Sequence, residues 1–256
     1  MAGWTICIAN QKGGVGKTTT SINLGTSLAI LDKKTLIVDI DPQGNATSGI
    51  GLGGEGQQSI YHALVLDEHM NAIIRQTEVP NLYFAYSNID LSGAEIELVN
   101  MPEREFRLKK SLDQIKADFD FIIIDCPPSL GLLTLNSLVA SDSVLIPLQC
   151  EYYALEGLSK LLKTIKLVQT RLNKNLILEG ILLTMYDKRN NLSHQVAEEI
   201  MKHFSAKVFS VIIPRSVRLA ECPSHGKPIY FYDRQSAGAQ SYLELAQQVL
   251  RKERNQ

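Results

Sequence analysis

A glycine-rich segment near the start of the chain has the composition of a phosphate-binding loop. It reads KGGVGKTT over residues 12–19, after an apolar run at residues 5–9 and before a segment with helical spacing. Glycines permit backbone turns that other residues avoid, and such turns point successive N–H groups at phosphate oxygens beside a helix N-terminus. We therefore expect nucleotide phosphates to bind the backbone of Gly13, Gly14, Val15 and Gly16.

Three side chains that follow these glycines could complete such a site. Lys17 would bring positive charge to the β- and γ-phosphates, the Thr18 hydroxyl is placed to ligate Mg²⁺, and Thr19 can donate a hydrogen bond to phosphate. The usual pattern has glycine where this chain has Gln11, and a second lysine, Lys12, precedes the glycines. The extra lysine indicates a deviant loop in which two cations, Lys12 and Lys17, would have to be accommodated in one small site.

Aspartates follow two of the apolar runs, at the strand ends where ligands of open α/β sheets gather. Asp39 and Asp41 occur in VDIDPQGN, and alternation along a strand places both side chains on one face. One carboxylate can hold the Mg²⁺ shell while the other orients an attacking water. Asp125 ends the run FIIID and fits a carboxylate that reaches Mg²⁺ through water. Together with the loop, these carboxylates predict hydrolysis of a nucleoside triphosphate.

Alternating strands and helices must position these groups. Apolar runs typical of buried strands lie at residues 5–9, 35–40, 121–125, 143–148, 176–184 and 211–214, with a further candidate at 82–86. Segments with helical spacing lie at residues 18–31, 103–117, 130–140, 155–172, 192–204 and 237–251. The alternation predicts an α/β fold, a single P-loop NTPase domain over residues 1–256 with a mostly parallel twisted sheet and helices on both faces.

The composition is typical of a globular protein. The 256 residues are 45% hydrophobic and 21% charged, which suits a globular core. No leader-like segment and no apolar stretch of bilayer length occurs, so we expect a cytosolic protein. The four cysteines form no CxxC pair, which favours buried thiols over disulfides or a zinc site.

Charge is distributed unevenly along the chain. Residues 1–150 contain 10 Lys and Arg against 17 Asp and Glu, a net charge of −7, whereas residues 151–256 contain 16 against 10, a net charge of +6. A basic half of this kind is either an ordinary solvated surface or a surface for a polyanion.

Long blocks of the sequence resemble the ParA family of deviant Walker-A partition ATPases, especially its Soj branch. The resemblance rests on KGGVGKTT, VDIDPQGNATSG and IIIDCPPSLGLL, and it continues through QCEYYALEGL, LLTMYDKRNNL, IPRSVRLAECPSHGKPI and AGAQSYLELAQQV. It implies a homodimer that encloses two ATP molecules with Mg²⁺, in which Lys12 of each subunit reaches the nucleotide of the other. It further implies catalytic roles for Lys12, Lys17 and Asp41, with Asp41 positioning water, and metal-site roles for Thr18, Asp39 and Asp125.

The same resemblance implies macromolecular partners. The ATP-bound dimer of such proteins binds double-stranded DNA without sequence preference, and a ParB/Spo0J-type partition protein stimulates a weak intrinsic ATPase. Nucleoid association and an influence on replication initiation are also implied. The positions that match DNA-contacting residues are Arg189 and Arg218, with Lys202 and Lys227 as further candidates. Pro214 and Ser216 match the segment against the adenine base, although many relatives have asparagine in place of Ser216.

Three other functions share the loop. A membrane-positioning ATPase of the MinD type would need an amphipathic C-terminal helix, and the tail LRKERNQ lacks the apolar anchor. An iron–sulfur reductase or cluster carrier would need cysteine ligands, and the flanks of Cys126 and Cys150, DCPPS and LQCEYY, do not resemble ligand loops. A bacterial tyrosine kinase would need a tyrosine-rich tail, whereas only Tyr230, Tyr232 and Tyr242 lie near the end.

Overall fold

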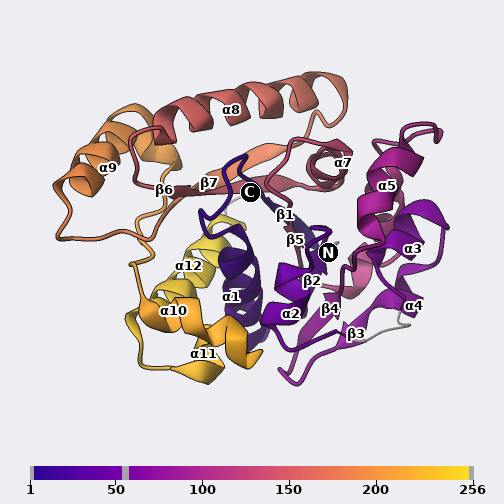
Figure 1. The fold of residues 1–256 in the computed structure, drawn as a ribbon, viewed down its shortest axis with the longest axis horizontal. Helices are drawn as coiled ribbons and strands as arrows, with labels where there is room; N and C mark the ends of the chain where they lie inside the picture. The colour runs from indigo at the N-terminus through magenta and orange to yellow at the C-terminus, as the bar shows by residue number, and fades with distance from the viewer. Residues whose placement is uncertain (1–2, 54–57, 254–256) are drawn as a thin grey trace.

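A computed structural model of the chain describes residues 3–53 and 58–253 and contains a seven-stranded sheet in the order β3-β4-β2-β5-β1-β6-β7 (Figure 1). All neighbouring strands run parallel except the short edge pair β3 and β4, which is antiparallel. The predicted α/β fold with a mostly parallel sheet is therefore confirmed. The strands are β1 Trp4–Ile8, β2 Thr35–Asp39, β3 Arg75–Gln76, β4 Leu82–Ala85, β5 Phe121–Asp125, β6 Ser143–Gln149 and β7 Ile177–Thr184.

The two faces of the sheet carry separate apolar cores, because successive side chains of a strand point to opposite faces. In β5, Ile122 and Ile124 belong to one buried cluster, whereas Phe121 and Ile123 belong to the other. A sheet that is buried on both faces needs continuous apolar strands, and this accounts for runs such as FIIID in the sequence.

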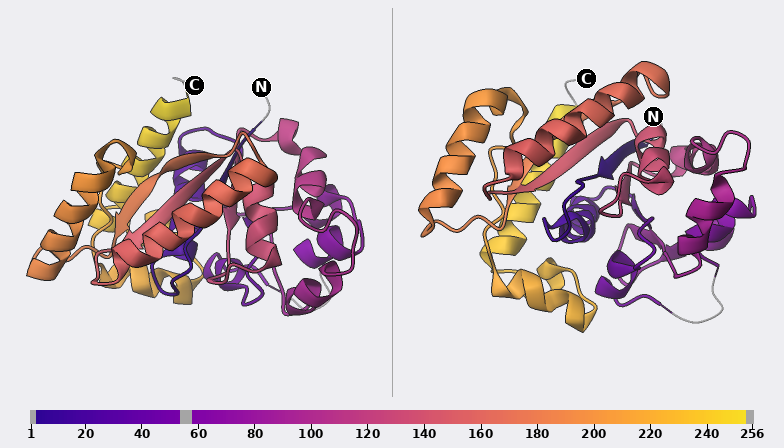
Figure 2. Two further views of the ribbon diagram at one scale, coloured as in Figure 1. Left: turned by 90° about the horizontal axis from the view of Figure 1, so that it is seen from above. Right: turned by 45° about the horizontal axis from the view of Figure 1, so that its top comes forward.

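Helices cover both faces, as predicted (Figures 1 and 2). Apolar residues of α3, α5, α6, α7, α8 and α9 pack in the first cluster, and those of α1 and α12 pack in the second. The α-helices are α1 Lys17–Ile30, α2 Asn45–Gly49, α3 Ile60–Val65, α4 Met70–Ile73, α5 Leu91–Leu98, α6 Arg107–Asp113, α7 Leu132–Ala140, α8 Ala154–Arg171, α9 Asn191–Phe204, α10 Val217–Glu221, α11 Ile229–Tyr232 and α12 Ala237–Glu253. Short 3-10 helices span Lys116–Asp118, Ser205–Lys207 and Cys222–His225.

One predicted helix is shorter than expected, and one predicted strand is not formed. The helix expected over residues 103–117 is confined to α6, because the chain turns before it, with a positive φ of 51° at Glu103. The strand expected at residues 211–214 is not a strand. Its main chain makes an isolated bridge between Pro214 and Tyr186 beside the end of β7, and Pro214 has no N–H to extend a ladder.

The helix that begins at the glycine-rich loop is held between the sheet and the last helix. α1 packs on α12, where Tyr242 is buried and its hydroxyl lies 3.2 Å from Thr20 Oγ1. Gly25 of α1 lies against the sheet, since a Cβ there would approach Ile37 to 2.7 Å. None of the described helices has the length and apolar character needed to cross a membrane.

The close approach of Gly25 to Ile37 predicts opposite effects for two glycine-to-alanine changes, one at Gly25 and one at a glycine with free space. Alanine favours a helix over glycine by about 1 kcal/mol, but steric overlap in a packed core costs about 1–3 kcal/mol. Gly25→Ala should therefore lower the unfolding free energy by up to about 2 kcal/mol. Gly157→Ala in α8, whose Cβ would meet nothing within 4 Å, should raise it by up to about 1 kcal/mol. Thermal unfolding of both variants measures this, and equal stability of the two would contradict the packing of α1 on β2.

Candidate functional site

The glycine-rich loop connects β1 to α1 at the carboxyl end of the sheet. Gly14 and Gly16 have φ values of 72° and 88°, and Gly16 occupies the position before the first helical residue, Lys17. Only glycine adopts these conformations without strain. A Cβ at Gly13 or Gly14 would meet no atom within 4 Å, so the loop backbone faces open space. An anion can approach it there at the positive end of α1.

Polar side chains from neighbouring strands hold the loop in place. Asn10 donates through Nδ2 to the carbonyl oxygen of Pro147 at 2.7 Å, and its Oδ1 accepts from the backbone N–H of Lys12 at 3.0 Å. On the other side, the Thr184 hydroxyl at the end of β7 donates to the carbonyl oxygen of Val15 at 2.8 Å. These contacts fix the loop to β6 and β7, so its N–H groups are oriented before a ligand binds.

Lys17 lies inside the loop. Its residue surface is only 6% exposed, and Nζ donates to the carbonyl oxygen of Lys12 at 3.1 Å, across the loop. Burial lowers the pKa of the Lys17 ammonium, while the charges of Asp125 and Asp41 act in the opposite direction. The loop therefore encloses one cation whose neighbours are carboxylates.

Asp125 lies at the end of β5 and contacts the first turns of α1. Its two oxygens accept hydrogen bonds from the hydroxyls of Thr18 at 2.9 Å and Ser21 at 2.8 Å. Burial, and after it the charge of Asp39, raises the pKa of Asp125 to about 8, against the effect of these hydrogen bonds. A hydroxyl and carboxylates crowded in this way form a set of hard oxygen donors that suits Mg²⁺, and a cation there would relieve the repulsion between carboxylates.

Asp39 and Asp41 have different surroundings although they are two residues apart. Asp39 is fully buried and accepts from the N–H and the hydroxyl of Thr47 at 2.9 and 2.7 Å and from the N–H of Asp41 at 3.1 Å. Burial raises the pKa of Asp39 to about 6. Asp41 accepts through one oxygen from the N–H of Gln43 at 3.0 Å, and among the described residues nothing donates to the other oxygen. Asp39 thus holds the turn after β2 by hydrogen bonds, whereas one carboxylate oxygen of Asp41 can accept a hydrogen bond from a ligand.

Lys12 lies on the rim of the loop rather than inside it. Its side chain is 49% exposed and forms an ion pair with Glu151, which follows β6. The two lysines of the loop therefore have separate environments, one enclosed and one facing outward.

A pocket of about 270 Å³ adjoins the loop. Its lining includes Gly16 and Thr19 from the loop and first turn, and Pro214 and Ser216 from the segment after β7 and α9. Met185, with a positive φ of 51°, also lines it. The Ser216 hydroxyl accepts from the N–H of Leu219 at 3.4 Å and so caps α10. The structure brings these four predicted residues together around one apolar space, whose size and position suit a nucleobase.

The predicted DNA-contacting residues are spread over the later part of the chain, and three of the four form ion pairs. Arg189 pairs with Asp187 at 3.1 Å, and Lys202 in α9 lies 3.9 Å from Glu199. Arg218 in α10 lies 3.4 Å from Glu221 and 3.6 Å from Asp233. Lys227, exposed after α10, lines a different pocket with Gly51 and Leu52.

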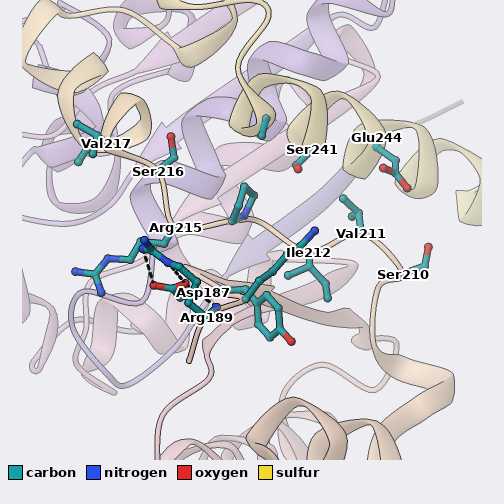
Figure 3. A pocket seen from close by; sticks show the side chains of 15 residues that line it. Asp187, Arg189, Ser210, Val211, Ile212, Arg215, Ser216, Val217, Ser241 and Glu244 are labelled. Atoms are coloured by element: carbon teal, nitrogen blue, oxygen red, sulfur yellow. Dashed lines mark hydrogen bonds and ion pairs between the residues drawn. The ribbon is translucent and has the colours of Figure 1, made fainter. Parts of the chain in front are cut away.

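An open pocket of about 960 Å³ lies beside Arg189 (Figure 3). Figure 3 shows Asp187, Arg189 and Arg215 gathered at one end and Ser210 and Glu244 at the other. Arg215 lines both this pocket and the smaller one beside the loop. The larger pocket therefore adjoins the predicted base site, with Arg215 on the boundary between them.

Sequence reasoning missed the residues that support the site. Asn10, Ser21, Thr47 and Thr184 donate or accept the hydrogen bonds that fix the loop and the carboxylates. Their only signal in the sequence is a polar residue at the end of an apolar strand or in the first turns of a helix, and such residues more often serve as ordinary caps.

Comparison with known protein sequences gives consistent matches over most of the chain. A family model described as an AAA domain matches residues 3–178. The sporulation initiation inhibitor protein Soj of Bacillus subtilis is 59% identical over 248 residues, which cover 96% of this chain and 98% of that protein. The chromosome partitioning protein ParA of Myxococcus xanthus is 57% identical over 252 residues, covering 98% and 89%.

Solved structures share the fold. A structure named cobyrinic acid a,c-diamide synthase from Mycobacterium smegmatis, with bound ADP and magnesium, has a TM-score of 0.85 and 38% identity over 97% of this chain and 94% of that one. The cell division ATPase MinD of Pyrococcus furiosus has a TM-score of 0.81 and 25% identity over 97% and 99%.

Three features now agree: a glycine loop with an enclosed and an outward lysine, aspartates at the carboxyl ends of β2 and β5, and high identity to Soj and ParA along almost the whole chain. The chain belongs to the ParA/Soj-type family of partition ATPases.

Proposed function

We propose that this protein is an ATP-driven DNA-partition switch: an ATP-bound dimer holds DNA non-specifically, and hydrolysis stimulated by a ParB-type partner releases it. The observation that carries this proposal is the separation of the two loop lysines. Lys17 is enclosed, as a residue that binds phosphate within its own subunit would be, while Lys12 faces outward and is available to a second subunit.

Nucleotide binding follows from the loop. The N–H groups of residues 13–16 with Lys17 and Thr19 would hold the phosphates, and the base would enter the pocket lined by Pro214 and Ser216. Thr18, Asp39 and Asp125 would surround Mg²⁺, which when bound neutralises charge on phosphate oxygens. The relative with bound ADP and magnesium supports this assignment. Because both oxygens of Asp39 already accept hydrogen bonds, its contribution would be through water or through charge.

Hydrolysis requires a group that orients water toward the γ-phosphate. Asp41 is suited to this because one of its oxygens is held by the turn while the other has no donor among the described residues. The turn itself is fixed by Asp39 through Thr47, so Asp41 is positioned by buried structure. The role is consistent with general acid–base catalysis by a carboxylate held at a strand end.

Dimer formation would change the partner of Lys12. Its ion pair with Glu151 is half exposed, and such pairs contribute little to stability, so exchange for a phosphate across the interface has a low cost. The dimer would also double the basic surface that Arg189, Arg218, Lys202 and Lys227 contribute. Phosphate contacts add, so the dimer would hold DNA and remain on the nucleoid while a monomer would dissociate.

Replacing the proposed water-positioning residue separates binding from hydrolysis. Asp41→Ala should keep ATP binding, dimerisation and DNA binding but lower stimulated ATP turnover by about 100-fold or more, the usual effect of losing such a group. Phosphate release and DNA retention measure the two properties. Asp118→Ala, an exposed aspartate near the opposite end of β5, is the matched control and should behave like the wild type. Normal turnover by Asp41→Ala would remove Asp41 from catalysis.

Charge reversal tests the DNA surface. Arg218→Glu should weaken DNA binding without loss of ATPase activity. The slope of log affinity against log salt should fall by about 2 for a dimer, since each phosphate contact contributes about 0.9. Arg251→Glu, the same change on the exposed end of α12, serves as control. If both variants keep the wild-type salt dependence, Arg218 makes no phosphate contact.

A further inference from the structure

Part of the basic charge of the C-terminal half lies on one helix away from the predicted DNA-contacting residues. α8 carries Lys160, Lys163, Lys166 and Arg171 against the single acid Glu156, and Lys174 follows its end. Figures 1 and 2 show α8 on the outside of the molecule over β6 and β7, on the opposite side from α10, which carries Arg218. α8 therefore carries a second basic surface.

An apolar groove of about 400 Å³ lies between α7 and α8. Leu130, before α7, and Leu167, in α8, are 41% and 55% exposed although both are large apolar side chains. The groove is lined mainly by leucine and valine from the two helices and the residues beside their ends, namely Leu130, Leu135, Leu138, Leu167, Val168 and Leu172. Exposed apolar side chains that line one groove mark an interaction site more often than scattered ones do.

Basic side chains lie along the edge of this groove at helical spacing. Residues three and four apart are neighbours on a helix, so Lys163, Leu167 and Arg171 lie in one row along α8. Arg171 itself lines the groove. Among the residues that the structure describes, Lys163, Arg171 and Lys174 form no ion pair, although all three are exposed. An unneutralised basic rim thus adjoins an apolar floor.

We infer that this groove docks an acidic amphipathic helix of a partner protein. A helix with leucine-like residues at positions i, i+3, i+4 and i+7 matches an elongated apolar groove, and this is a recurring mode of peptide recognition. Glutamate or aspartate on its flanks would face Lys163, Arg171 and Lys174. The complementary charges would speed association and fix the orientation of the helix.

Nucleic acid fits this surface less well than a helix does. A phosphate backbone has no apolar group for the leucines, whereas burial of apolar area drives docking of an amphipathic helix. In Figure 1, α10, the helix that contains Arg218, lies on the opposite side of the molecule from α8. The inference is independent of the proposed partition function, since no lining residue belongs to the phosphate loop or to the predicted DNA set.

The test measures binding of a fluorescent model peptide to the full chain by anisotropy. The peptide has about 18 residues, or five helical turns, with leucines on one face and glutamates on the other. We expect saturable binding that weakens at least about tenfold when the glutamates are replaced by lysines, a change of about 1.4 kcal/mol. A similar loss should follow Leu167→Asp and the double change Lys163→Glu with Arg171→Glu.

Lys166→Glu is the matched control, because Lys166 lies on the same helix but none of the residues three or four positions from it lines the groove. It should bind the peptide like the wild type, and all variants should keep wild-type ATPase activity and helical content. Absence of saturable peptide binding by the wild type would overturn the inference. An equal loss of peptide affinity in Lys166→Glu would also overturn it. So would displacement of the peptide by duplex DNA, if Leu167→Asp did not change that competition.

Discussion

One buried ammonium among three buried carboxylates is the electrostatic constraint on which this molecule depends. Lys17 is enclosed by the loop, and Asp39, Asp41 and Asp125 lie at the carboxyl ends of two adjacent strands. Burial makes each ionised carboxylate costly and the neighbouring carboxylates add repulsion, and these effects raise the pKa values of Asp39 and Asp125. A divalent cation that arrives with a triphosphate would relieve the repulsion, so binding of ligand and relaxation of the site are linked.

The fold supplies the geometry that this constraint requires. Parallel pairing of β2 with β5 sets Asp39 beside Asp125, and pairing of β1 with β5 sets the loop next to both. α1 brings Thr18 and Ser21 onto Asp125, and it is itself held between the sheet and α12. Since each of these elements is buried, the site is shaped before ligand binding. The outward Lys12 is the exception, and it is the residue for which the family resemblance implies a role across a subunit interface.

The sequence predicted the elements that obey simple periodicity and missed those governed by particular contacts. Runs such as FIIID are strands because both sheet faces are buried, and the glycine loop was recognisable because few other sequences permit its backbone. The segment at Val211 looked like a strand by composition but only bridges to the end of β7, since Pro214 lacks an N–H. The supports from Asn10, Thr47 and Thr184 depend on which strands become neighbours, which no local pattern specifies. The charge asymmetry was visible in the sequence, but its division between α8 and the surface around Arg189 and Arg218 required the fold.

In the proposed switch, nucleotide state controls assembly through the outward lysine, Lys12. The most direct measurement is sedimentation of the protein, with and without duplex DNA, in the presence of ADP, of ATP and of no nucleotide, for the wild type and Lys12→Ala. We expect a DNA-retaining dimer of the wild type only with ATP, and a monomer that still binds ATP for Lys12→Ala. A wild-type protein whose size and DNA retention are the same in all three states would contradict it.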